Sequence, residues 1–416
     1  MNSNLAKYNR HWERDFVYPY PIKRKIFSSI VPYLYKKNIL ELSGLRRVGK
    51  STLMYQMINE LLYKKIDPYH ILYFTFDESQ LPIEELFHSY FVQARIDYKR
   101  EPVYIFLDEI QKLKNFQNQI KVYYDLYPNI KFIISGSTSF FIRKKTQESL
   151  AGRVISFVIL PLFFDEYLMF CGKEEFLKKP KLYEKDLEQE FGIFLNSQFI
   201  ESISMKNTFE KKEYFSSIIK KIIYEDLPSI VSFDNPSILF RMAEYIAQKP
   251  GCIINNLHFA QELQISNKTV ALYLSYLEEA HLIKKFYNFS RNLITSEKRF
   301  KRYYLASPSF SLSLVDFLDS GVVFENYIAS IIHANYFYRD VYQHEVDFIQ
   351  IDNNKNIIPI EAKYSSAIKT KELNNICLFM NKFAITKGIV LYGGVERKTI
   401  KQGDKKIVLT PYTSYE

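Results

Sequence analysis

The chain has 416 residues and a net charge of +10. A chain of this length predicts two to four domains, and the positive charge favours a polyanionic partner, nucleic acid before an anionic membrane. Hydrophobic residues make up 47% and charged residues 25%. This balance is ordinary for a soluble globular protein and excludes a chain that is disordered throughout.

Targeting and redox signals are weak. The three cysteines, Cys171, Cys252 and Cys377, have neither pairing nor metal-ligand spacing, which predicts reduced thiols. The segment Met1 to Asp15 is polar and lacks the apolar core of a signal peptide. No uncharged apolar run reaches 18 residues, so we expect no transmembrane helix, no membrane partner and a cytoplasmic location.

A phosphate-binding loop is the strongest motif. Gly44 to Thr52 reads GLRRVGKST, which fits G-x-x-x-x-G-K-[ST], with an apolar strand before it and a helical pattern after it. The backbone of this loop would hold the phosphates of ATP, Lys50 would bridge the β- and γ-phosphates, and Ser51 would ligate Mg²⁺. The predicted ATP-binding residues of the loop are Gly44, Arg46, Arg47, Val48, Gly49, Lys50, Ser51 and Thr52.

Four further apolar runs predict strands of the same parallel sheet, at residues 70–76, 103–107, 130–135 and 154–160. The third strand of the chain, which we expect to lie beside the strand before the phosphate-binding loop, runs into Asp108 and Glu109. Parallel sheets bind ligands at the carboxyl edge of their strands, so we predict Asp108 in the Mg²⁺ shell and Glu109 as the catalytic base. The alternative is that this acidic pair caps the helix that follows.

Several hydroxyl and arginine side chains are further candidates for contacts with the nucleotide. Ser137 and Thr138 follow the fourth strand and would sense the γ-phosphate, or they are ordinary turn residues. Arg153 would stabilise the transition state in cis, or across a subunit boundary in a homo-oligomer, or it is a surface arginine. Arg46 and Arg47 would contact phosphate or a neighbouring acid.

Five motifs recur here in one order and carry a family resemblance. They are GLRRVGKST at 44–52, LDEIQ at 107–111, SGSTS at 135–139, LAGR at 150–153 and PLFFDEY at 161–167. In this combination nearly the whole chain resembles the AAA-type ATPases of bacteria and archaea that carry a C-terminal domain of unassigned function. That family usually has an Asp after its Tyr-rich strand, where this chain has Ala306 and Ser307, so the next helix is expected to be held differently.

The middle of the chain predicts a helical connector followed by a winged helix-turn-helix. Residues 184–227 have a charged helical pattern, and we expect them to pack on the ATPase core. Two helices at 256–263 and 266–280, then strands at 281–287 and 302–305, follow the order of a winged helix.

Basic residues concentrate in the predicted wing. They are Lys284, Lys285, Arg291, Lys298, Arg299, Lys301 and Arg302, against one acid, Glu297. Interleaved aromatic residues suit a surface that contacts phosphates, and Asn267, Lys268 and Thr269 would face outward at the start of a recognition helix. Winged helices also serve as protein-binding modules, so both interpretations remain open.

The last hundred residues resemble the PD-(D/E)XK nuclease-like core in element order, αββαββ, with room for one more strand before Asp347. Glu361 and Lys363 are two apart on a strand and share a face, while Asp347 lies on the neighbouring strand and Glu325 on the preceding helix. Glu325, Asp347 and Glu361 would bind Mg²⁺, and Glu361 and Lys363 would act in catalysis. Pro359 predicts an edge or a bulge, and the alternative is a binding fold without catalysis.

The predicted fold class is α/β: a P-loop NTPase sheet, a winged helix and an α/β restriction-endonuclease-like domain. The predicted boundaries are 1–170 for the ATPase, 171–235 for the connector, 236–310 for the winged helix and 318–416 for the nuclease-like domain. The favoured function is an ATP-hydrolysing, Mg²⁺-dependent protein that binds DNA in repair, defence or mobile-element biology and could cleave it. The alternative is a nucleotide-gated regulatory switch whose C-terminal domain binds a partner without catalysis.

Overall fold

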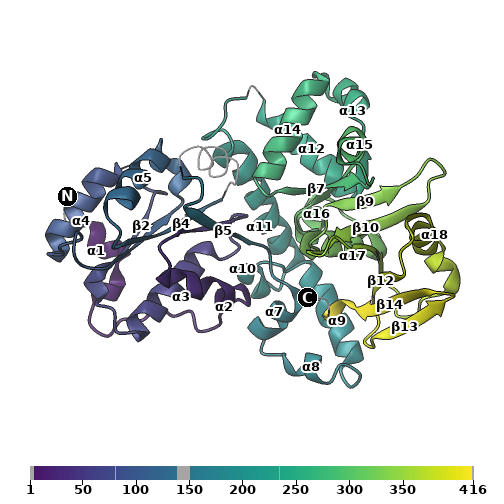
Figure 1. Ribbon diagram of the computed structural model, residues 1–416, viewed down its shortest axis with the longest axis horizontal. Helices are drawn as coiled ribbons and strands as arrows, with labels where there is room; N and C mark the ends of the chain where they lie inside the picture. Colours follow the sequence, from purple (N-terminus) through teal and green to yellow (C-terminus); the bar gives the residue numbers. More distant parts are fainter. Residues whose placement is uncertain (1–3, 80, 138–149, 234, 415–416) are drawn as a thin grey trace. The chain divides into compact units, whose positions relative to one another are not determined.

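The computed structural model describes residues 4–79, 81–137, 150–233 and 235–414, and the chain divides into two compact units (Figure 1). The first unit comprises residues 1–160, 224–233 and 279–281. The second comprises residues 161–223, 234–278 and 282–416. Within the described ranges, no helix combines the length and the apolar character needed to cross a membrane.

The first unit is built on a parallel sheet with the strand order β2-β3-β4-β1-β5. Its strands are β1 (Ile39–Gly44), β2 (Ile71–Thr75), β3 (Val103–Asp108), β4 (Ile130–Gly136) and β5 (Val154–Ile159). Their near-continuous apolar runs suit a parallel sheet, which is covered on both faces. The five strands predicted from the sequence are confirmed within one or two residues.

Helices of the first unit cover this sheet. They are α1 (Asn4–Tyr8), η1 (Arg10–Trp12), α2 (Ile26–Ile30), η2 (Val31–Tyr35), α3 (Lys50–Tyr63), η3 (Pro68–His70), α4 (Ile83–Ala94), η4 (Ile110–Lys112) and α5 (Phe116–Leu126). The ring of Phe87 on α4 lies 4.7 Å from Tyr123 on α5 and 6.2 Å from Phe132 on β4, between ring centroids. Buried aromatic rings such as these contribute about 1.5–3 kcal/mol each and hold α4 and α5 against the sheet.

The strand order corrects one expectation about the phosphate-binding loop. The sequence places Asp108 on a strand next to the strand that leads into the loop. In the structure β4 lies between β1 and β3, so these two strands are not neighbours. The loop and Asp108 still meet, because the carboxyl ends of all parallel strands lie at one edge of the sheet.

The second unit begins with helices: α7 (Phe164–Phe170), α8 (Glu175–Lys178), α9 (Glu184–Leu195), α10 (Ile200–Ile203) and α11 (Thr208–Lys221). A single π-helical turn, η5 (Ile222–Asp226), follows α11. The expectation that the connector packs on the ATPase core stays a prediction, and helix α9 packs within the second unit. Its Phe191 lies 4.1 Å from Tyr412 and 5.3 Å from Tyr327, both in the C-terminal part of the second unit.

The second unit contains one mixed sheet with the strand order β13-β14-β12-β11-β10-β9-β7-β8-β6. Its strands are β6 (Cys252–Ile254), β7 (Ile283–Asn288), β8 (Lys301–Leu305), β9 (Tyr336–Arg339), β10 (Glu345–Ile351), β11 (Ile357–Lys363), β12 (Lys387–Tyr392), β13 (Lys398–Gln402) and β14 (Lys405–Pro411). The remaining elements are α12 (Pro236–Gln248), α13 (Asn256–Leu263), α14 (Asn267–Glu279), α15 (Leu293–Lys298), α16 (Pro308–Leu314), α17 (Ser320–Ile331), η6 (Thr370–Leu373), α18 (Asn374–Phe383) and η7 (Tyr412–Ser414).

The predicted boundary between a winged helix and a nuclease-like domain does not separate two sheets. Strand β7 of the predicted wing pairs in parallel with β9 of the C-terminal segment, through Tyr287–Tyr336 and Asn288–Phe337. These strands run side by side in Figure 1. The predicted helices at 256–263 and 266–280 are present, and so is the extra strand before Asp347, which is β9.

The structure shows how Pro359 is accommodated in the sheet and how the helix after Ser307 is held. Pro359 lies on β11, an interior strand, but the ladder from β11 to β12 begins only at Ile360, so Pro359 is paired on one side. A strand position without a second neighbour tolerates the missing N–H. Ser307 caps α16 by accepting the Ser309 N–H at 3.1 Å, and it also donates its hydroxyl to Gln198 at 2.5 Å.

Candidate functional site

The phosphate-binding loop has a backbone that side chains would obstruct. Gly44 has φ +143°, and a Cβ there would lie 2.3 Å from the carbonyl oxygen of Ile159. Gly49 has φ +95° and immediately precedes α3. Both residues therefore have to be glycine for the turn to form, which is the role that the sequence motif predicts.

Lys50 lies between the loop and Glu109, the predicted catalytic base. It is buried, and its Nζ donates to the carbonyl oxygens of Gly44 at 3.1 Å and Leu45 at 2.9 Å. The same Nζ lies 3.9 Å from Glu109 Oε1. The ammonium group is thus placed at the carboxyl edge of the sheet, within reach of both phosphate and base.

The Asp108 carboxylate accepts hydrogen bonds from hydroxyl groups on three elements, α3, β2 and β4. Its Oδ2 accepts hydrogen bonds from Ser51 Oγ at 2.5 Å and from Tyr73 OH at 2.7 Å. Its Oδ1 accepts a bond from Ser135 Oγ and another from the Glu109 N–H at 3.1 Å. Ser51 and Asp108 present adjacent oxygens, the donor type that Mg²⁺ prefers, so these residues fit the predicted metal.

Glu109 is oriented by a residue that the sequence argument did not assign. Gln111 donates from Nε2 to Glu109 Oε2 at 2.5 Å and to Ser137 Oγ at 3.0 Å. The buried Oε1 of Gln111 has no hydrogen-bond partner among the described residues. Glu109 itself has φ +51° and makes no side-chain cap bond to η4, which argues against the capping interpretation. The sequence signal that could have identified Gln111 is its position two residues after Glu109, the predicted base.

Arg46 contacts an acid that is remote in the sequence. Its Nη1 donates to Asp226 Oδ1 at 2.7 Å and to Oδ2 at 2.9 Å. Both residues belong to the first unit, since residues 224–233 pack there. Burial lowers the pKa of Arg46, but Asp226, Glu109 and Asp77 outweigh burial and the net shift is upward. No sequence signal identifies Asp226, which lies 180 residues away.

The remaining residues predicted to bind ATP lie in or near the phosphate-binding loop, except for one outside the described residues. The Val48 carbonyl accepts a hydrogen bond from Arg24 Nη1 at 3.2 Å, which ties the loop to the preceding segment. Arg47 has φ +64°, and Thr52 lies in the first turn of α3. Ser137 is buried beside Gln111, whereas Thr138 lies outside the described residues.

Arg153 is not at the ATP site of its own chain. Its carbonyl accepts the Ile39 N–H at 2.8 Å, at the start of β1. The phosphate-binding loop begins at the other end of that strand, about 16 Å away at 3.3 Å per residue. The Arg153 side chain pairs with Asp125, with Nε to Oδ1 at 3.0 Å. The predicted role in cis is therefore wrong, and a role across a subunit boundary stays a prediction.

The predicted acidic cluster of the second unit assembles from three elements. Glu361 Oε2 lies 2.9 Å from Lys363 Nζ on β11, and Asp347 Oδ2 accepts the Ala362 N–H at 2.9 Å. Burial, followed by Asp347, raises the pKa of Glu361. Burial and Asp347 also raise the pKa of Glu325 on α17 to about 7. The three carboxylates are close enough to influence one another's protonation.

Arg302 lies among these carboxylates. Its Nη1 is 3.4 Å from Glu325 Oε1 and 4.0 Å from Asp347 Oδ1, and its Nη2 contacts Glu345. Tyr304 OH also donates to Glu325 Oε1, at 2.5 Å. Among the described residues, no group of three His, Cys, Asp or Glu side chains has a geometry that could hold a metal ion. The described residues therefore do not form the predicted Mg²⁺ site in this arrangement, in which Arg302 and Lys363 offset part of the charge of the acids.

The prediction that the basic residues of the wing contact phosphates is wrong for those that are buried or already paired. Arg302 is buried, and Lys284 donates to the Ile332 carbonyl at 2.5 Å, where burial lowers its pKa to about 7. Lys285 pairs with Glu278 at 2.5 Å. On strands β7 and β8, which are interior to the nine-stranded sheet, the described side chains are buried or partly buried. Arg291, Arg299 and the helix-start residues Asn267 and Lys268 are exposed.

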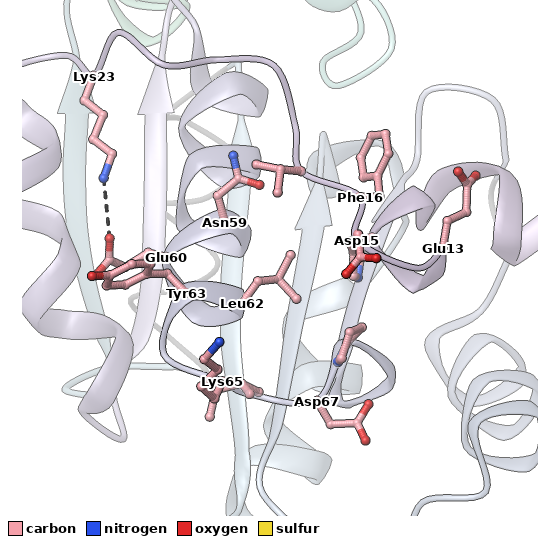
Figure 2. Close-up of a pocket in the computed structure, with 14 residues that line it drawn as sticks. Glu13, Asp15, Phe16, Lys23, Asn59, Glu60, Leu62, Tyr63, Lys65 and Asp67 are labelled. Carbon is pink, nitrogen blue, oxygen red and sulfur yellow. Dashed lines mark hydrogen bonds and ion pairs between the residues drawn. The ribbon is translucent and has the colours of Figure 1, made fainter.

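A large hollow in the first unit lies away from the phosphate-binding loop. The volume of this hollow is about 970 Å³, and Lys23 Nζ lies 3.4 Å from Glu60 Oε2. Figure 2 shows this pair beside Asn59 and Tyr63. Asn59 lies nine residues after Lys50 on α3, about 13 Å along the helix. The hollow is therefore not the place where the phosphates would bind.

Three family models match separate parts of the chain. Residues 36–168 match one described as an AAA domain. Residues 199–315 match a domain of unknown function, DUF8612, and residues 320–415 match another, DUF4143. The AAA match covers the phosphate-binding loop, Asp108 and Glu109.

Two relatives of this chain are themselves named only as uncharacterized proteins. One protein of Methanocaldococcus jannaschii is 26% identical over 94% of this chain and 90% of its own length. An uncharacterized protein of Haemophilus influenzae is 27% identical over 59% of this chain and 61% of its own length. The chain thus aligns along nearly its full length with the first of these relatives.

Solved structures give a more distant likeness. AMPPCP-bound DnaA from Aquifex aeolicus is 17% identical, with a TM-score of 0.31 over 61% of this chain and 86% of that chain. Cdc6p from Pyrobaculum aerophilum is 12% identical, with a TM-score of 0.31 over 76% of this chain and 97% of that chain. Residues 36–168 are thus similar to an AAA domain, and the phosphate-binding loop and Asp108 described above lie within that match.

Proposed function

We propose that this protein is an ATP-hydrolysing switch whose C-terminal part binds a partner without cleaving it. The observation that carries the proposal is the group formed by Lys50, Ser51, Asp108 and Glu109 at one sheet edge. Lys50 would bind the β- and γ-phosphates, and Glu109, held by Gln111, would accept the proton of the attacking water. Mg²⁺ held by Ser51 and Asp108 would neutralise charge on the phosphates.

The contact between Arg46 and Asp226 favours a switch. Arg46 belongs to the phosphate-binding loop, and Asp226 ends the π-helical turn that follows α11. A bound phosphate would compete with Asp226 for the Arg46 guanidinium, because both are anions that accept paired N–H donors. Nucleotide occupancy would then change how the 224–233 segment is held. Asp226 is joined through that segment to α11 on one side and α12 on the other.

The ion pairs of Arg302 favour a C-terminal part without catalysis. Hydrolysis of a phosphodiester by Glu361 and Lys363 would require a metal to activate water. Arg302 and Lys363 offset part of the charge of the carboxylates that would hold it, which are Glu325, Asp347 and Glu361. Incubating the protein with supercoiled plasmid and Mn²⁺, with and without ATP, tests this. If the wild type nicks the plasmid and Asp347→Asn does not, the C-terminal part is a nuclease and the proposal of a non-catalytic part is wrong.

Nucleic acid is the partner that we propose for the second unit. The net charge of +10 and the exposed start of α14, at Asn267 and Lys268, favour it. The decisive experiment measures ATP turnover with no nucleic acid, with single-stranded DNA and with duplex DNA. Turnover that depends on Lys50 and changes with DNA supports both parts of the proposal. If no nucleic acid changes the ATP turnover and the protein binds none, the proposed ATPase activity stands and the proposed nucleic-acid partner is wrong.

A further inference from the structure

We infer that the seam between β7 and β9 carries a binding site for the backbone of single-stranded nucleic acid. A hollow of about 520 Å³ opens there, within the second unit. It is lined by Ile253, Asn288, Arg299, Phe300, Tyr338, Arg339, Asp340, Val341 and Lys382. The inference rests on the nucleic-acid partner proposed above and gives that partner a location and a chemical class.

The lining is cationic. Arg299, Arg339 and Lys382 bring three positive charges, against one negative charge from Asp340. The Asp340 oxygens already accept bonds from His344 Nδ1 at 3.0 Å and from the N–H groups of Tyr342 and His344. Arg339 Nε lies 3.7 Å from Glu345, which offsets part of its charge. Arg299 and Lys382 therefore remain the main attraction for an anion.

The cations are held in place by neutral contacts. Asn288 donates from Nδ2 to the Arg339 carbonyl at 2.9 Å and accepts the Arg339 N–H at 3.2 Å, which joins β7 to β9 at the hollow. Lys382 Nζ donates to Tyr338 OH at 2.7 Å, and Arg299 Nη1 donates to the Phe289 carbonyl at 3.1 Å. A guanidinium group has five N–H donors, so Arg299 can hold this contact and still bind phosphate.

Exposed apolar side chains surround the same hollow. Phe300 is 58% exposed, Val341 is 90% exposed and the adjacent Tyr342 is 79% exposed. Large aromatic side chains left in water beside cations are the combination that single-stranded nucleic acid requires, since bases stack on the rings while phosphates contact the cations. A duplex hides its base faces inside the stack and could not use these rings. The combination therefore points to an unpaired strand.

Fluorescence anisotropy of the full chain with labelled single-stranded oligo-dT tests the site. The charge variant is Arg299→Ala with Lys382→Ala. Its matched control is Lys401→Ala with Lys406→Ala, two exposed lysines on β13 and β14 at the other end of the sheet. Loss of two phosphate contacts should lower the slope of log affinity against log salt by about 1.4, because each single-strand contact contributes about 0.7. The control should keep the wild-type slope.

A second pair of variants separates stacking from charge. Phe300→Ala with Tyr342→Ala should weaken binding about fivefold or more without changing the salt slope, because stacking on an aromatic side chain does not release counterions. Arg299→Lys with Lys382→Arg should retain the slope. The free energy of unfolding in urea and the basal ATP turnover of every variant should equal those of the wild type, which shows that both units of each variant are folded.

The outcomes distinguish this inference from the proposed partner. If the wild type binds neither oligo-dT, oligo-rU nor duplex DNA, the nucleic-acid partner and this site both fail. If it binds oligo-dT but the charge variant behaves like its control, the partner stands and this site is wrong. Tighter binding of duplex than of single strand would also overturn the site. Tighter binding of oligo-rU than of oligo-dT would support it and identify the strand as RNA.

Discussion

The guanidinium group of Arg302 on β8 lies 3.4 Å from the Glu325 carboxylate on α17. Arg302 belongs to the segment predicted as the wing, and Glu325 belongs to the segment predicted as the nuclease-like domain. The contact is buried on the arginine side, and it is reinforced by Tyr304, which donates to the same Glu325 oxygen. One ion pair therefore joins two segments of the sequence into a single folded unit.

Replacing Arg302 with methionine should destabilise the second unit by about 3–5 kcal/mol, because its carboxylate partners would be left buried without their counter-ion. The measurement is urea unfolding of the full chain. Arg397→Met is the matched control, since Arg397 is exposed and its loss should change the free energy of unfolding by less than about 0.5 kcal/mol. Equal stability of the two variants would contradict a structural role for Arg302.

The stability of the second unit should fall as pH rises from about 4.5 to 7. Burial, followed by the charge of Asp347, raises the pKa of Glu325 from 4.5 to about 7 against the opposing effects of Arg302, Tyr304 and Lys363. In this pH range the folded state keeps a proton that the unfolded chain has lost, so each rise in pH favours unfolding by up to about 1.4 kcal/mol per unit.

Glu325→Gln should flatten this pH dependence, because glutamine does not titrate. Glu361, whose pKa burial also raises, should leave a residual slope. The check is the free energy of unfolding measured in urea at several pH values. The exposed Glu213 serves as control, and Glu213→Gln should keep the wild-type slope. A variant at Glu325 with an unchanged slope would show that this carboxyl is ionised throughout the range.

Two substitutions at the ATP site should separate binding from chemistry. Lys50→Ala should abolish tight binding of Mg²⁺-ATP, because the ammonium group bridges the phosphates. Glu109→Gln should retain binding and lose hydrolysis by about 10²- to 10⁴-fold, the usual contribution of a general base. Binding is measured with a fluorescent ATP analogue, and hydrolysis by phosphate release. Wild-type turnover in Glu109→Gln would remove Glu109 from the catalytic role.

Asp226→Asn should uncouple the 224–233 segment from the nucleotide. In the wild type we expect a non-hydrolysable ATP analogue to increase amide hydrogen exchange in this segment, because phosphate draws Arg46 away from Asp226. In Asp226→Asn the exchange should be high already and should not respond. Asp125→Asn removes the same charge from the ion pair with Arg153, at the opposite edge of the sheet, and should respond as the wild type does. If the ATP analogue does not change amide hydrogen exchange of residues 224–233 in the wild type, the proposed switch is wrong.

The ATP site was largely predictable because its parts are local or repeat a period. The glycines of the loop are required by φ values of +143° at Gly44 and +95° at Gly49, and Asp108 and Glu109 follow an apolar run that could only be a buried strand. Parallel strands bring such ends to one edge whatever the strand order. The error that placed β3 beside β1 therefore did not displace Asp108 from Ser51.

What the sequence alone determined is the local backbone: the phosphate-binding loop, the strands with their acidic ends and the helices around Lys268. Tertiary structure decided which charges meet. Asp226 reaches Arg46 across 180 residues, and Arg302 enters the acidic cluster because β7 pairs with β9. A lysine or arginine has the same local pattern whether it faces water or a buried carboxylate. Only the fold of the whole chain determines burial, and burial determines whether that charge is free to bind a ligand.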